Sequence, residues 1–168
     1  KINNMVNLAT LDIIATGNMM GEIFHKLTKD SVRREDLKIV AQGIAAHVAG
    51  AAARQYTRCT GNKLRKVVAL DPSKIFAQSM KALTGLTRGD AKFIQAIHTT
   101  ANSMGTRTRV GNVDFYVNGP SAAVPGAKSI VEASTRAIRY FAESVIPGNE
   151  NNFPSVAASS LRQYENNN

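Results

Sequence analysis

The stretch that most constrains the fold is residues 37–55, where a short apolar run leads through small residues into an alanine-rich segment. Residues 37–40 predict a buried strand, and residues 45–55 predict a helix. Ala41 and Gly43 lie between them, and Ala45 starts the helix; these small residues let strand and helix pack closely across a sharp turn. Residues 66–70 predict a second buried strand. Strand, helix and strand at this spacing indicate a βαβ unit with parallel strands.

A sharp strand-to-helix turn between small residues is the geometry of a nucleophile elbow, written G-x-S-x-G in hydrolases. The central serine of that motif exposes its hydroxyl for attack. Here the five positions are Ala41, Gln42, Gly43, Ile44 and Ala45, so the flanks are small but glycine stands at the nucleophile position. Glycine has no side chain to attack with and adopts positive φ with little strain. The sequence therefore predicts a hydrolase architecture whose chemistry has been removed.

The rest of the pattern predicts an α/β domain with a mostly parallel central sheet flanked by helices. Residues 93–98 and 113–117 predict further strands, and the apolar spacing of residues 130–145 predicts a last helix. The first part of the chain predicts an amphipathic helix with one face on a core, formed by Leu8, Leu11, Ala15, Met19, Ile23 and Leu27.

The organisation of the chain suggests one domain and a tail. Residues 73–89 are expected to be irregular with some helical character. Residues 1–148 are expected to form the domain, incomplete at its N-terminus because the chain starts inside a helical pattern. Residues 149–168 are rich in asparagine and serine and are expected to be loosely held.

Composition narrows the possible functions. The chain has 168 residues, 43% of them hydrophobic, and no apolar run approaches the length needed to span a bilayer. The net charge of +9 leaves a polyanion-binding module open as an alternative, but the charges are dispersed, so we expect no nucleic-acid partner. The single cysteine, Cys59, is expected to be at least half-buried. We expect no cofactor and no metal site.

One carboxylate follows the second strand directly. Asp71 precedes Pro72, and a residue before proline avoids the right-handed helical region, so an extended Asp71 is expected. The carboxyl ends of parallel strands are where α/β proteins place their sites. A turn or capping carboxylate is an equally good reading of this residue.

Several short runs resemble consecutive signatures of the pancreatic-type lipase family. They are Leu70-Asp71-Pro72, residues 89–93, Ile97-His98-Thr99, residues 112–115 and Asn118-Gly119. Within that family the chain is most similar to the yolk proteins of higher flies, through residues 139–145 and above all residues 152–160. The resemblance covers nearly the whole chain and implies an α/β-hydrolase fold.

The resemblance places the three positions of a catalytic triad, in the chain order serine, aspartate, histidine. The serine position is Gly43, the aspartate position is Asp71 and the histidine position is Ser134. Two of the three members are therefore replaced, and no catalytic residue is expected. Ser134 acting as a nucleophile is a weaker alternative, because a serine near a helix start is usually a cap. His98 belongs to the Ile-His-Thr strand and is expected to be structural.

The resemblance also implies a biological role. It implies a secreted, non-enzymatic yolk storage protein that travels from haemolymph to egg yolk and carries lipid-like or steroid-conjugate ligands. It further implies an oocyte uptake receptor and self-association, with no transmembrane segment. The alternative function is a weak or active lipase, or another carboxylic ester hydrolase, in lipid metabolism.

Overall fold

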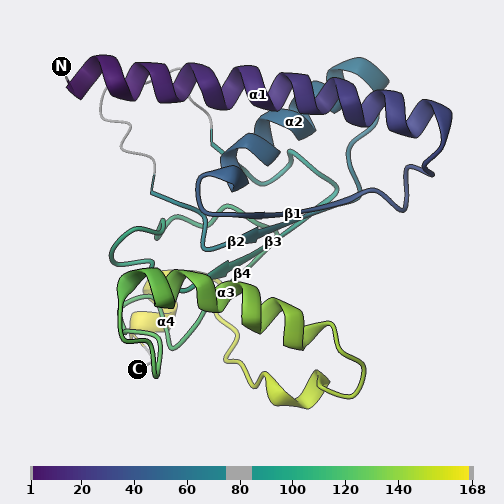
Figure 1. Cartoon of the computed structure of the whole chain (residues 1–168). Helices are drawn as coiled ribbons and strands as arrows, with labels where there is room; N and C mark the ends of the chain where they lie inside the picture. Colours follow the sequence, from purple (N-terminus) through teal and green to yellow (C-terminus); the bar gives the residue numbers. More distant parts are fainter. Residues whose placement is uncertain (1, 75–84, 167–168) are drawn as a thin grey trace.

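The computed structural model describes residues 2–74 and 85–166. Within these ranges the chain forms four strands and four α-helices (Figure 1). In order, the elements are α1 (Ile2–Asp30), β1 (Lys38–Gln42), α2 (Ala45–Thr60), β2 (Lys66–Leu70), β3 (Phe93–His98), β4 (Val113–Tyr116), α3 (Ile130–Ser144), the 3₁₀ turn η1 (Glu150–Asn152) and α4 (Leu161–Asn166).

The four strands form one parallel sheet in the order β1-β2-β3-β4. Val40 pairs with Val68 across the first ladder, and Ile97 pairs with Phe115 across the last. Strand β2 is buried along nearly its whole length, which is why its sequence is an unbroken apolar run rather than an alternation. The predicted parallel α/β fold is confirmed.

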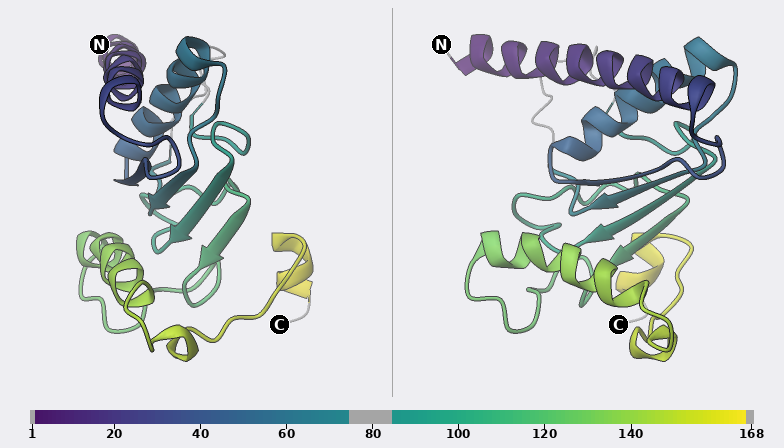
Figure 2. Two further views of the ribbon diagram at one scale, coloured as in Figure 1. Left: turned by 90° about the vertical axis from the view of Figure 1, so that its right-hand side faces the viewer. Right: turned by 45° about the vertical axis from the view of Figure 1, so that its right-hand side comes forward.

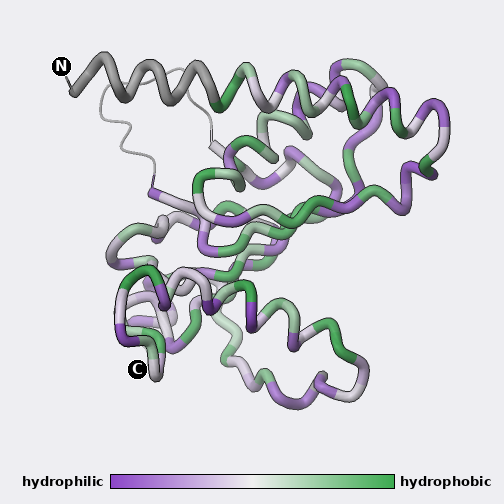
Figure 3. Tube along the Cα trace, in the orientation of Figure 1, coloured by the Kyte–Doolittle hydropathy of each residue, from purple (hydrophilic) through white to green (hydrophobic). Residues whose placement is uncertain are grey.

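Helices cover both faces of the sheet. Helix α2 lies on one face with α1 outside it, and α3 lies on the other face (Figures 1 and 2). Hydrophobic stretches gather along the strands, and others remain at the surface on α3 (Figure 3). Among the described residues, no helix has both the length and the apolar character to cross a membrane.

The first helix forms as predicted, but its buried face is not the predicted one. Met19, Ile23 and Leu27 are exposed by 65%, 51% and 41%, whereas Gly17 and Gly21 are buried. A Cβ on Gly17 would lie 2.4 Å from the Cβ of Ala51, so the glycines let α1 approach the backbone of α2 closely. The prediction that this face meets the core is therefore wrong for these three residues and for Ala15, which is also exposed. The side chains of Leu8 and Leu11 lie outside what the structure describes.

The predicted boundaries shift by a few residues. Strand β1 begins at Lys38 and continues to Gln42, and α2 runs to Thr60. Gly61 ends α2 in the left-handed region, with φ of 69° and its N–H bonded to the carbonyl of Thr57. The predicted burial of Cys59 is wrong, since its side chain is exposed. Of the irregular segment predicted at residues 73–89, positions 75–84 lie outside the described residues.

The C-terminal segment makes specific contacts with the domain. The Arg109 Nη1 donates to the carbonyl of Ser159 at 2.8 Å, and Arg107 pairs with Glu165. The ring of Tyr164 lies against Gly119, where a Cβ would approach the phenol oxygen to 2.8 Å. The division into a domain at residues 1–148 and a tail at residues 149–168 stays a prediction.

Candidate functional site

The turn between β1 and α2 has the geometry of an elbow. Gly43 has φ of +58°, a conformation that side-chain-bearing residues rarely adopt. Its N–H donates to the carbonyl of Leu70 at 2.9 Å, and its carbonyl accepts from the N–H of Ser73 at 3.3 Å. These two bonds hold the elbow against the carboxyl end of β2. Ile44 caps α2 without a side-chain hydrogen bond and is 53% exposed.

Asp71 lies beside this elbow, at the carboxyl end of β2. Its predicted extended backbone is wrong, because φ is +45°. The side chain is buried, and the carboxylate accepts three hydrogen bonds from the start of the next loop: 3.0 Å from the N–H of Thr99, 2.8 Å from the N–H of Thr100 and 2.7 Å from the hydroxyl of Thr100. These donors fix the carboxylate and offset the left-handed backbone.

Ser134 lies within α3 and is half-buried. Its carbonyl accepts from the Gln42 side-chain amide at 3.3 Å, which ties α3 to the elbow. Ser134 was expected to cap this helix, but it does not. Ser129 is the cap and accepts from the N–H of Glu132 at 3.1 Å. Positions 43, 71 and 134 thus come from three elements to one end of the sheet.

Two polar residues near the elbow were not predicted to be part of the site. A Cβ on Gly43 would lie 3.3 Å from the hydroxyl oxygen of Ser73, so a hydroxyl borders the nucleophile position. His47, on the first turn of α2, contacts the same residue through the Ser73 carbonyl at 2.8 Å. The sequence feature that could have predicted this proximity is the βαβ connection, which brings the loop after β2 against the start of α2.

The imidazole of His47 is held in one tautomer. Its Nδ1 accepts the N–H of Leu86 at 3.1 Å, so Nε2 carries the proton and donates to the Ser73 carbonyl. Burial lowers the pKa of His47, with a further lowering from Arg54, and the bond to Ser73 opposes them only partly. Both nitrogens are therefore occupied, and the ring has no lone pair left to accept a proton from a serine hydroxyl.

His98 ends β3 and is also fully engaged. Its Nδ1 faces the carbonyl of Thr106 at 3.0 Å, its Nε2 faces Asp114 Oδ1 at 2.9 Å, and its ring stacks on Tyr116. The side chain is fully buried. This is the structural role expected from the sequence. In the described ranges, no group of three or more His, Cys, Asp or Glu side chains is placed to hold a metal ion.

We predict that His47 makes stability depend on pH. The folded state holds the ring neutral while the unfolded chain binds a proton near pH 6.5, so the unfolded state takes up more protons as the pH falls below that value. Stability should therefore fall between pH 7 and pH 5, by at most about 1.4 kcal/mol per pH unit. Urea unfolding of the intact protein at several pH values measures this slope.

Two histidine substitutions, one a test and the other its control, check this assignment. His47→Gln should flatten the slope, because the titrating ring is gone. His25→Gln on the half-buried face of α1 is the matched control, because it removes an imidazole outside the contacts of His47. A slope that survives His47→Gln in full would contradict the assignment.

Comparison with known proteins agrees with this architecture. A family model described as Lipase matches residues 1–168. The chain belongs to the lipase family. The match extends over the whole chain. The resemblance to the lipase family that the short motifs indicated is therefore confirmed.

Two groups of relatives stand out among the matches of this lipase-family chain. It is 61% identical to Vitellogenin-1 of Ceratitis capitata over 167 residues, which is 99% of the chain and 38% of that protein. It is 51% identical to Vitellogenin-3 of Drosophila melanogaster, over 98% of the chain and 39% of that protein. Phospholipase A1 of Vespula maculifrons is 32% identical over 77% of the chain and 44% of its own length. The chain spans about two fifths of these vitellogenins.

Proposed function

We propose that this chain is the lipase-like part of a non-enzymatic yolk storage protein. The observation that carries the proposal is the elbow, where Gly43 stands at the nucleophile position with φ of +58° and offers no attacking atom. Serine hydrolases need a nucleophile and a free base, and losing members of the triad lowers the rate by about 10⁴-fold or more. The similarity to proteins named vitellogenin supports the same role.

The surrounding histidines support the loss of chemistry. A base must present an unprotonated nitrogen to a hydroxyl. His47 donates from Nε2 and accepts at Nδ1, and both nitrogens of His98 face oxygen acceptors. The position equivalent to the catalytic histidine is Ser134.

The proposal includes the biological setting implied by the family. The intact protein is secreted, passes from haemolymph to egg yolk through an oocyte uptake receptor, and self-associates in storage. It carries lipid-like or steroid-conjugate ligands as well as serving as a nutrient reserve. The retained lipase architecture supports a carrier role, because α/β folds commonly bind small molecules in apolar clefts.

An ester-hydrolysis assay on the intact protein tests the absence of enzyme activity. We expect no turnover of short-chain esters or phospholipids above background. The competing candidate is a weak ester hydrolase, favoured by the Ser73 hydroxyl beside the elbow and by the phospholipase A1 relatives. Turnover that disappears with Ser73→Ala, but persists with Ser103→Ala on an exposed turn, would overturn the proposal.

We predict that restoring the nucleophile alone does not restore activity. Gly43→Ser supplies a hydroxyl, but the ring nitrogens of His47 and His98 are already engaged, so hydrolysis should stay at background. Gly43→Ser with Ser134→His adds an imidazole on the helix that is tied to the elbow, and a general base contributes about 10²–10⁴-fold. The double variant should therefore show a measurable rate against p-nitrophenyl esters. Strong hydrolysis by Gly43→Ser alone would show that a base is already present.

A further inference from the structure

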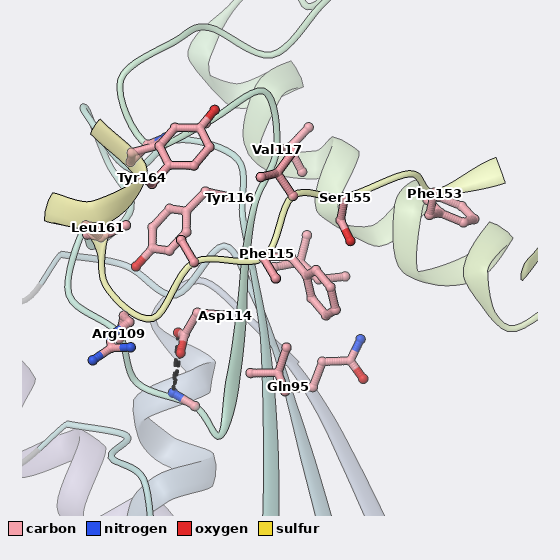
Figure 4. Close-up of a pocket in the computed structure, with 18 of the residues that line it drawn as sticks. Gln95, Arg109, Asp114, Phe115, Tyr116, Val117, Phe153, Ser155, Leu161 and Tyr164 are labelled. Atoms are coloured by element: carbon pink, nitrogen blue, oxygen red, sulfur yellow. Dashed lines mark hydrogen bonds between the residues drawn. The ribbon is translucent and has the colours of Figure 1, made fainter. Parts of the chain in front are cut away.

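A cleft of about 1050 Å³ opens at the edge of the sheet opposite the elbow. One wall is β4 with the loops on either side of it, and the other is the C-terminal segment from Asn152 to Tyr164 (Figure 4). Tyr140 and Ser144 of α3 also line the cleft. This volume is at the upper end of the range for small-molecule sites. The cleft is far along the sheet from Gly43, because β1 and β4 are its two edge strands.

The floor of the cleft includes apolar side chains of β4 that remain partly exposed. Helix α3 packs on Val68, Leu70 and Ile97 of the inner strands. On the same face of β4, Phe115 and Val113 remain 41% and 39% exposed. Successive residues of a strand alternate between faces, so Val117 continues this row. From the opposite wall, Phe153 and Val156 also line the cleft.

The charged side chains that line the cleft make one end of it positive. Arg88 and Arg109 are its cations, and Asp114 is its carboxylate. Burial raises the pKa of Asp114, but hydrogen bonds from His98, Val110 and Gly111 outweigh it, so the net shift is downward and the carboxylate is already committed to these donors. Arg109 donates to the Ser159 carbonyl, a neutral acceptor that leaves the positive charge in place.

The arrangement of these groups matches one kind of ligand. Figure 4 shows Arg109 toward one end of the cleft, with Phe115 and Phe153 toward the other. A molecule that fits has a single anionic head and a long apolar body. We propose that this cleft binds an unesterified long-chain fatty acid, with its carboxylate at Arg109 and its hydrocarbon chain along Phe115 and the rest of the apolar floor.

This inference rests on the carrier role proposed above and deepens it by moving the ligand away from the elbow. An apolar floor makes affinity depend on chain length, because each buried methylene group strengthens binding about three- to four-fold. Affinity should therefore rise from decanoate to palmitate. The positive end makes affinity depend on the head group, so palmitate should bind at least ten-fold more tightly than its methyl ester.

Three tyrosines of this chain are placed to report on a ligand in the cleft. The chain has four tyrosines and no tryptophan, and Tyr116, Tyr140 and Tyr164 line the cleft. Energy transfer from tyrosine to bound cis-parinaric acid, a fluorescent fatty acid, measures binding to the intact protein in solution. Displacement of that probe by unlabelled palmitate gives the affinity of each variant.

Two variants and two matched controls locate the site. Phe115→Asn and Arg109→Gln should each weaken palmitate binding at least ten-fold, and Arg109→Gln should also abolish the preference over the methyl ester. Ile44→Asn, at the exposed elbow, and Arg65→Gln, an exposed arginine outside the cleft, should change nothing. If Phe115→Asn does not fold, Val156→Asn on the 79%-exposed opposite wall replaces it.

The possible contrary outcomes separate the two proposals. Binding weakened by Ile44→Asn, and untouched by changes at Phe115 and Arg109, would overturn the cleft assignment while leaving the carrier role in place. No binding of parinaric acid by the intact protein would overturn the cleft assignment and the carrier role together. In neither case is the storage role affected.

Discussion

Asp71→Ala is expected to lower the free energy of unfolding of the intact protein by about 3 kcal/mol or more. The substitution removes the acceptor of three hydrogen bonds and leaves the donors of Thr99 and Thr100 buried without it. Each buried donor left unsatisfied costs about 1–3 kcal/mol. Alanine also tolerates φ of +45° poorly, which adds to the loss. The midpoint of urea unfolding, followed by circular dichroism, measures this change.

The matched variant is Asp71→Asn. Its amide oxygen can still accept from the two backbone N–H groups, and asparagine adopts positive φ more readily than alanine. The loss of stability should therefore be clearly smaller than for alanine. Equal losses for the two variants would mean that the hydrogen bonds from residues 99 and 100 do not stabilise the fold.

His98→Ala is expected to be comparably severe, at about 3–5 kcal/mol, which is the usual range for truncating a large buried ring to alanine. The ring and the Asp114 carboxylate are 0% and 3% exposed, so removing the ring leaves a buried carboxylate without one of its partners. The substitution also opens a cavity where the ring stacked on Tyr116, with 4.3 Å between the ring centroids. Urea unfolding at pH 7 gives the size of the effect.

A double-mutant cycle separates the hydrogen bond between His98 and Asp114 from the packing of the ring. His98→Ala and Asp114→Asn should be strongly non-additive, because the second change removes the charge that the first leaves unpaired. Additive losses would contradict a direct interaction and would assign the effect of His98→Ala to the cavity alone.

The local sequence was sufficient to predict the sheet and the elbow. Buried parallel strands have continuous apolar sequences, and residues 66–70 have that pattern without ambiguity. The small residues around Gly43 allow only a close strand-to-helix turn, and the structure has a positive φ there. Both features depend on neighbours in sequence, so the chain itself contains the information.

Features that depend on distant contacts were not predictable in the same way. The buried face of α1 is set by the close approach of α2 at Gly17, which a count of large apolar residues does not detect. The backbone conformation of Asp71 depends on hydrogen bonds from Thr99 and Thr100, which are distant in the sequence. The role of His47 required knowing that Leu86 and Ser73 lie on either side of one ring.

The hydrogen bonds of Asp71 bear on how catalytic aspartates are recognised in lipase-like sequences. A Cβ on Gly105 would lie 2.7 Å from Asp71 Oδ1, and Gly105 also donates its N–H to the Thr100 hydroxyl that reaches the carboxylate. An acid embedded this way has an architectural reason to be present whether or not the chain is catalytic. An aspartate at this point of a lipase-like sequence is thus poor evidence of hydrolytic activity. Surveys that separate active from inactive homologues should instead ask whether a nucleophile is present at the elbow.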